Sequence, residues 1–143
     1  MSQLERAISI AVNAHSGQVD KAGNPYILHP LRMMLRLDGE AERIVAVLHD
    51  VLEDTSVTAA DLRREGFPDE ILDALECVTK REGESYQEFV ARAAANPIAH
   101  RVKLADLEDN MDVRRLKRVT ERDRKRISKY LRAWRHLRSL PET

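Results

Sequence analysis

One stretch decides how the chain folds and what chemistry it offers, and it reads Val47-Leu48-His49-Asp50-Val51-Leu52-Glu53-Asp54-Thr55. It places an imidazole and three carboxylates among apolar residues. Burying such groups without partners costs several kcal/mol, so they normally persist only with a metal, an ion pair or a catalytic task. On a helix, Glu53 lies one turn beyond His49, and Asp54 lies one turn beyond Asp50. The spacing therefore predicts a metal site with an adjacent general acid or base.

The apolar residues of the rest of the chain recur at helical spacing, without an alternating strand pattern. Residues 41–53 are the most apolar segment, which predicts a continuous central helix that is buried on most sides. The expected helices begin near residues 2, 30, 41, 58, 68, 85, 97 and 120, several of them at capping boxes. The sequence thus predicts an all-α fold: a single domain over 1–143, built as a bundle of roughly eight helices, with the C-terminal helix at about 120–138 packed on the rest.

The composition is that of one helical domain without a membrane segment. A chain of 143 residues fits the usual size of a single domain, with 43% hydrophobic and 34% charged residues. Cys77 is the single cysteine, so no internal disulfide can form. The sequence offers no signal peptide and no apolar run of membrane-spanning length. These features predict a cytoplasmic location.

The formal net charge is zero, from 24 basic and 24 acidic residues, yet the C-terminal end is basic. The cationic residues there are Arg114, Arg115, Lys117, Arg118, Arg122, Arg124, Lys125, Arg126, Lys129, Arg132, Arg135 and Arg138. An apolar stripe of Ile127, Leu131, Trp134 and Leu137 runs along the same helix. We expect this stripe to dock on the domain while the cations face solvent, which favours a solvated helix face over a nucleic-acid interface.

Four residues could converge on one divalent cation: His29, His49, Asp50 and Asp106. Mixed imidazole and carboxylate donors suit Mn, Fe, Zn or Mg and leave positions open for water and substrate. The alternative is that the histidines are ordinary core residues and that Asp106 is an ion-paired carboxylate. Glu53 and Asp54 are placed to orient or deprotonate a water beside the cation, unless they are merely a solvated helix end.

The sequence resembles the HD-domain metal-dependent phosphohydrolases, and within them the small RelA/SpoT-type hydrolases of the alarmone (p)ppGpp. The matching blocks are Ala14-His15-Ser16-Gly17-Gln18, Gly23-Asn24-Pro25-Tyr26-Ile27-Leu28-His29-Pro30, HDVLEDT at 49–55, Val78-Thr79-Lys80, Glu84-Ser85-Tyr86, Lys103-Leu104-Ala105-Asp106 and Asn110-Met111. A lone His-Asp pair is a weak signal, whereas this ordered series over roughly residues 7–116 is a strong one.

The resemblance implies that His29, His49, Asp50 and Asp106 bind a divalent cation, foremost Mn²⁺, and that Glu53 and Asp54 act on the attacking water. It implies that Lys21 contacts substrate phosphates and that Asn110 contacts the nucleoside. The reaction it implies removes pyrophosphate from the 3′ position of ppGpp or pppGpp.

Helical spacing adds two further candidates for phosphate binding. Arg32 follows His29 by three residues, and Lys103 precedes Asp106 by the same interval, so each shares a helix face with an expected metal ligand.

Two positions depart from the family pattern. The arginine that the family has just before the loop lysine, where it lies against the guanine base, is Asp20 here. The family's Arg-Leu-His after the metal-binding aspartate is Leu107-Glu108-Asp109. An anion in place of an arginine loses cation–π attraction and repels phosphates. We therefore expect a more acidic site and weaker recognition of (p)ppGpp.

Three other functions are compatible with the sequence. The first is HD-domain hydrolysis of another nucleotide or phosphoester, and the second is a module that senses a nucleotide without cleaving it. The third is nucleic-acid binding through the basic C-terminal segment. The expected partner in the leading interpretation is a small anionic nucleotide, with nucleic acid disfavoured and the oligomeric state open.

Overall fold

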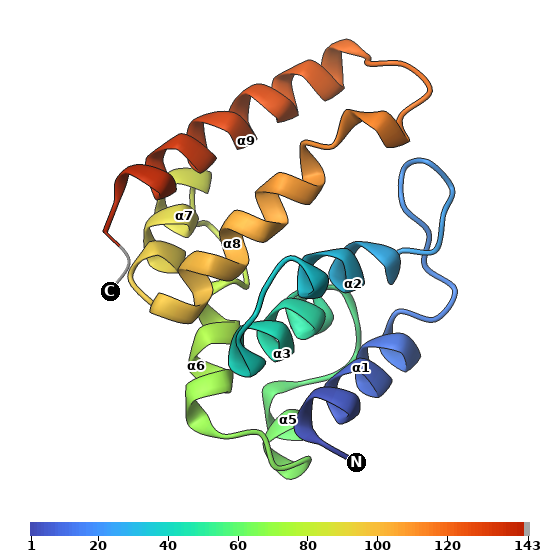
Figure 1. The fold of residues 1–143 in the computed structure, drawn as a ribbon, viewed down its shortest axis with the longest axis vertical. Coiled ribbons are helices and arrows are strands. Elements are labelled where there is room, and N and C mark those ends of the chain that lie inside the picture. The colour runs from blue at the N-terminus through green and yellow to red at the C-terminus, as the bar shows by residue number, and fades with distance from the viewer. Residues whose placement is uncertain (142–143) are drawn as a thin grey trace.

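The structure, a computed structural model, describes residues 1–141, and its regular elements over this range are all helical (Figure 1). The elements are α1 (Gln3–Ala14), α2 (Leu28–Leu35), α3 (Glu40–Leu48), α4 (Val51–Asp54), α5 (Ala59–Arg64), α6 (Asp69–Cys77), α7 (Tyr86–Ala94), α8 (Pro97–Asn110), the 3-10 turn η1 (Val113–Arg115) and α9 (Glu121–Ser139). The sole extended pairing in the described range is an isolated bridge between Val19 and Pro25. The predicted all-α fold is confirmed.

The predicted continuous helix over 41–53 is wrong, because the structure divides it at His49 and Asp50 into α3 and α4. In an unbroken helix the Ala46 carbonyl would accept the Asp50 N–H. Here the His49 ring donates to that carbonyl from Nδ1, at 2.8 Å. A side chain that enters the backbone ladder is a recognised cause of such breaks. The division raises the expected eight helices to nine within the described residues.

The main core is organised around α3. Its residues Ile44 to Leu48 are at most 1% exposed, and the helix contacts α1, α2, α6 and α8 (Figure 1). A helix that is apolar on all sides is stable only when neighbours cover every side, which the bundle provides. The end of α3 therefore delivers His49 and Asp50 into the protein interior.

A smaller core joins α9 to α7 and α8. It contains Val90, Leu104, Leu107, Ala133 and Leu137. The His100 Nε2 lies 2.9 Å from the Leu137 carbonyl, and the Trp134 indole donates to Glu108 Oε2 at 2.9 Å. Figure 1 shows α9 running along α7 and α8, and these contacts fix it there.

No helix within residues 1–141 combines the length and the apolar character needed to cross a membrane. The cytoplasmic location stays a prediction.

Substituting the side chain that anchors α9 should destabilise the protein. Leu137 is fully buried, and Leu137→Ala should lower the free energy of unfolding by about 2–5 kcal/mol in urea titrations. Leu131 lies on the same helix but is 40% exposed, so Leu131→Ala should change stability by less than about 0.5 kcal/mol. Equal losses in the two variants would contradict the observed docking of α9.

Candidate metal and substrate site

The structure brings together the four residues that the sequence analysis assigned to a cation. His29 comes from the first turn of α2, His49 and Asp50 from the break between α3 and α4, and Asp106 from α8. His29 Nε2 lies 3.0 Å from Asp106 Oδ1, and His49 Nε2 lies 3.0 Å from Asp50 Oδ2. Ligand atoms of His29, His49 and Asp50 all lie within 4.8 Å of one another. Two imidazole nitrogens and two carboxylates therefore face one small volume.

Both histidines present Nε2 to this volume because their Nδ1 atoms are engaged elsewhere. His49 Nδ1 donates to the Ala46 carbonyl, and His29 Nδ1 lies 2.6 Å from Asp109 Oδ2. Such partners fix the tautomer and ring orientation of metal-binding histidines. The donor set thus fits a divalent cation.

Asp109 is a site residue for which the sequence indicated only added negative charge, without a partner or a structural role. It is fully buried, and Arg32 holds its carboxylate with Nε at 2.7 Å and Nη2 at 3.0 Å. Arg36 and Arg115 stand farther off, at 3.9 and 3.7 Å. The available signal was its position three residues after Asp106 on a helix, which puts both carboxylates on one face.

The expectation that Glu108 and Asp109 make the site more acidic is corrected. Asp109 is balanced by the Arg32 guanidinium and the His29 ring. Glu108 accepts a hydrogen bond from Trp134 and lies 3.7 Å from Arg36. Neither carboxylate lines the cavity that opens onto the His-Asp cluster. Arg32 is also outside that lining, because its guanidinium is turned to Asp109.

The buried cluster shifts the pKa values of its members. Burial lowers the pKa of His29, but hydrogen bonds and charges of Asp106 and Asp109 outweigh it and raise the pKa to about 9. Burial raises the pKa of Asp50, yet the His49 charge and hydrogen bond bring it down to about 2. The Tyr26 hydroxyl donates to Asp50, and burial together with that carboxylate raises the pKa of Tyr26. Without a cation, protons on the histidines balance the carboxylates.

Glu53 and Asp54 lie beside this cluster at the end of α4. Carboxylate oxygens of Asp50, Glu53 and Asp54 lie within 4.8 Å of one another. Burial, and then the Asp50 charge, raise the pKa of Asp54, and burial raises the pKa of Glu53. Glu53 Oε1 accepts the Lys80 N–H at 3.1 Å. A raised pKa makes a carboxylate a better proton acceptor, which suits both residues to acid–base chemistry beside the cluster.

A cavity of about 440 Å³ opens onto the cluster, and we call it the metal-side cavity. Besides His29, His49, Asp50, Glu53 and Asp106, it is lined by the substrate candidates Lys21, Lys103 and Asn110. Lys103 is 6% exposed, with Nζ at 2.9 Å from Asp106 Oδ2, and the Asn110 amide donates to Asp106 Oδ1 at 2.9 Å. Of the predicted site residues, Asp54 and Arg32 alone do not line it.

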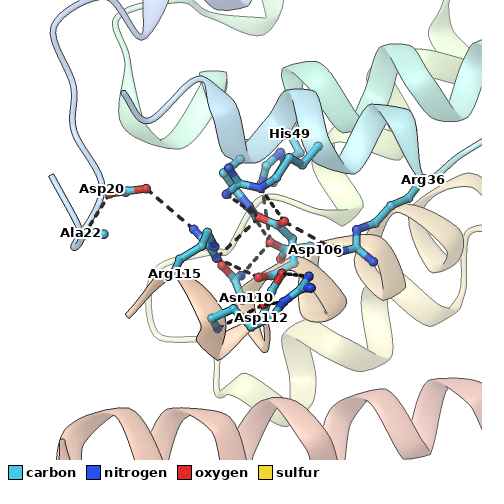
Figure 2. A network of polar contacts seen from close by, with 12 residues as sticks. Asp20, Ala22, Arg36, His49, Asp106, Asn110, Asp112 and Arg115 are labelled. Atoms are coloured by element: carbon cyan, nitrogen blue, oxygen red, sulfur yellow. Dashed lines mark hydrogen bonds and ion pairs between the residues drawn. The ribbon is translucent and has the colours of Figure 1, made fainter. Parts of the chain in front are cut away.

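The loop before α2 is shaped by Asp20. Its Oδ1 accepts the N–H groups of Ala22 at 2.9 Å and Asn24 at 3.0 Å, and its Oδ2 lies 3.7 Å from Arg115 Nη1. Figure 2 shows Arg115 between Asp20 and the carboxylates around Asp106. The negative charge of Asp20, which was expected to repel phosphates, is therefore largely offset by these hydrogen-bond donors and by Arg115. Asp20→Arg would also remove the loop's internal cap, so that variant alters loop shape together with charge.

Comparison with known proteins places this arrangement in a family. No protein-family model matches the chain. The chain is 35% identical over 140 residues to a guanosine-3′,5′-bis(diphosphate) 3′-pyrophosphohydrolase of Aquifex aeolicus, covering 89% of this chain and 20% of the relative. It is 35% identical to a GTP pyrophosphokinase of Streptomyces coelicolor, covering 87% of this chain and 16% of the relative. The chain thus spans a fifth or less of the length of these curated relatives.

A solved structure described as a metazoan ortholog of SpoT that hydrolyzes ppGpp shares the fold. It matches with a TM-score of 0.79 at 23% identity, covering 97% of this chain and 87% of that one. The sequence matches extend over the segments that carry the His-Asp cluster, and the structural match extends over almost all of the bundle. The chain therefore belongs to the HD-domain proteins of the RelA/SpoT type.

Proposed function

We propose that the chain is a metal-dependent phosphohydrolase that cleaves guanosine 3′,5′-bis(diphosphate), ppGpp, and its triphosphate form pppGpp. Water adds across the bond between the ribose 3′ oxygen and phosphorus, which releases pyrophosphate and leaves GDP or GTP. The observation that carries the proposal is the convergence of His29 and His49 with two carboxylates in a cavity that also holds Lys21 and Lys103.

His29, His49, Asp50 and Asp106 would hold the cation. Two nitrogen and two oxygen donors suit Mn²⁺, with Fe, Zn or Mg as other choices. When bound, the cation supplies Lewis-acid polarisation of the scissile phosphoryl group and lowers the pKa of water. Asp109 keeps His29 in the tautomer that offers Nε2, and Arg32 keeps Asp109 in place.

The remaining residues act on water and substrate. Glu53 and Asp54 accept the proton of the attacking water, a role that their raised pKa supports. Lys21 and Lys103 neutralise phosphate oxygens, and Asn110 contacts the nucleoside. For Arg32 we now favour a positioning role over the substrate contact that helical spacing suggested, because its guanidinium is committed to Asp109.

Hydrolysis of a different nucleotide is the second candidate. The observation that favours it is the 15–27 loop, where Asp20 stands in place of the family's arginine and caps the loop's own backbone. The cation, the water and the two acidic residues would act in the same way.

Loss of a metal ligand should abolish stoichiometric metal binding. His49→Ala and Asp50→Asn should each purify with far less than one equivalent of Mn²⁺ or Fe by elemental analysis, because each change removes one of the four protein donors. His136→Ala removes an exposed imidazole from α9 and should retain the metal. Chelation should lower the melting temperature of the parent, since a bound ligand stabilises the native state by mass action. Full metal content in His49→Ala and Asp50→Asn would refute the assignment.

Substitutions of Glu53 and Asp54 should reduce turnover without reducing metal binding. Glu53→Gln and Asp54→Asn should keep the metal yet lose about 10²- to 10⁴-fold in turnover, because an amide cannot accept the proton. Glu82 is exposed, and Glu82→Gln provides the matched control, which should retain full turnover. A fully active Glu53→Gln would exclude Glu53 from proton transfer.

The substrate can be identified by a screen. Mn²⁺-loaded protein should release pyrophosphate from ppGpp and pppGpp, with phosphate and pyrophosphate measured separately. Nucleoside mono- to triphosphates and dinucleotides are the comparison compounds. Turnover of one of these with ppGpp untouched would replace the leading proposal by the second candidate.

A further inference from the structure

The loop between α6 and α7, residues 78–85, contacts the candidate site through its backbone. It contains the block 78–80 and the start of the block 84–86, both of which match the family pattern and have no role in the proposed function. Its Lys80 N–H donates to Glu53 Oε1 at 3.1 Å. The position of this loop therefore bears on the orientation of Glu53.

Arg92, in the last turn of α7, fixes the 78–85 loop from the side of the protein interior. Its guanidinium forms a forked pair with Glu84, with Nε at 2.5 Å from Oε2 and Nη2 at 2.9 Å from Oε1. Nη1 donates to the Glu76 carbonyl and Nη2 to the Thr79 carbonyl, both at 2.7 Å. The side chains of Arg92 and Glu84 are 19% and 9% exposed, so water competes little for these bonds. We call this set of contacts the Arg92 clamp.

One peptide group links the Arg92 clamp to Glu53. The carbonyl of Thr79 accepts from Arg92, and the N–H of the same peptide group, which belongs to Lys80, donates to Glu53. A trans peptide group is planar, and its C=O and N–H point in opposite directions. Holding the carbonyl against the guanidinium therefore directs the N–H toward the carboxylate. A cation on the carbonyl also polarises the peptide group, which strengthens the N–H as a donor.

The Lys80 N–H restrains a side chain whose orientation matters for chemistry. Glu53 lines the metal-side cavity and has three rotatable side-chain torsions. With Oε1 occupied by the N–H, Oε2 remains available for a water proton. Proton transfer needs donor and acceptor in a narrow range of distance and angle, so a base held in advance reacts faster than a mobile one.

We propose that Arg92 is a positioning residue for the hydrolytic step: through the peptide group of Thr79 and Lys80, it holds the Glu53 carboxylate in the orientation that accepts the proton of the attacking water. This inference rests on the proposed function and adds to it a residue that lies outside the lining of the metal-side cavity.

A purely structural role is the competing explanation, in which the Arg92 clamp only ties α6 to α7. Both explanations predict lower stability when Arg92 is substituted. The positioning role alone predicts that the effect on turnover depends on Glu53. Arg43 provides a matched control, because it is also half-buried and its Nε holds a loop carbonyl, that of Leu37, at 2.6 Å.

The kinetic test uses the Mn²⁺-loaded protein. Arg92→Ala should lower kcat for ppGpp about 10- to 100-fold, the range expected for a misplaced catalytic group. KM should stay within about twofold, since the change acts on the transition state. Arg92→Lys keeps the charge but cannot reach all of these acceptors at once, so it should show a smaller loss in kcat. Arg43→Ala should retain kcat within about twofold.

A double-mutant cycle separates positioning from structure. In a Glu53→Gln background, Arg92→Ala should lower the residual kcat by less than about twofold, because the base it positions is already absent. Arg92→Lys takes its place in the cycle if Arg92→Ala does not fold. Parental kcat in the Arg92 variants, or an equal loss with and without the Glu53 carboxylate, overturns the proposal.

Exchange of the Lys80 amide proton distinguishes failure of this inference from failure of the proposed function. If the parent cleaves no ppGpp, the proposed function fails, and NMR of the diamagnetic Mg²⁺-loaded protein still tests whether Arg92 orients the N–H. The Lys80 amide should exchange faster in Arg92→Ala and in Glu53→Ala, and at the parental rate in Arg43→Ala. A parental rate in Arg92→Ala overturns the proposed link.

Discussion

The structure depends on balancing the charges of a cluster of imidazole and carboxylate groups that is buried inside an apolar helical bundle. His29 and His49 are nearly inaccessible, Asp106 is largely buried, and burial opposes charge on each of them. A charge in such a setting is tolerable only with close partners or a cation. The break after α3, the entry of α2 and the face of α8 together bring these groups within contact distance. The break between α3 and α4 thus helps to pair the buried charges, because it turns His49 Nε2 toward Asp50.

Helix α8 connects this cluster to the substrate side. Lys103, Asp106 and Asn110 follow one another at intervals of three and four residues, so they form a single polar stripe on an otherwise buried helix. Asp109 lies on the adjoining flank and reaches His29 on α2. Its backbone carbonyl in turn holds Arg115, which faces Asp20 in the loop. A continuous set of polar contacts therefore runs from the metal-side cavity to the loop before α2.

The helix caps and the polar groups of the site could be predicted from the sequence. The competition between a side chain and the backbone for one carbonyl group could not. The capping boxes at Ser2, Thr58, Ser85 and Thr120 form as expected, because each needs residues only three apart. The convergence of His29, His49, Asp50 and Asp106 follows from placing polar groups on the buried faces of helices. Periodicity could not reveal that the His49 ring captures the Ala46 carbonyl. It also could not pair Asp109 with Arg32, because 77 residues separate them.

At the position where the family has an arginine, this chain has Asp20. The positive charge beside the site is supplied by Arg115 from another segment instead. A carboxylate there organises the loop through two backbone N–H groups and faces Arg115. A cation on a flexible loop must be ordered when substrate binds, and immobilising a long side chain costs roughly 0.5–1.5 kcal/mol. Arg115 is held beforehand by the Asp109 carbonyl, so less of that ordering is left for the binding step. Charge supplied from η1 instead of the loop also stands in the lining of the metal-side cavity beside Asp123 and Arg126 of α9.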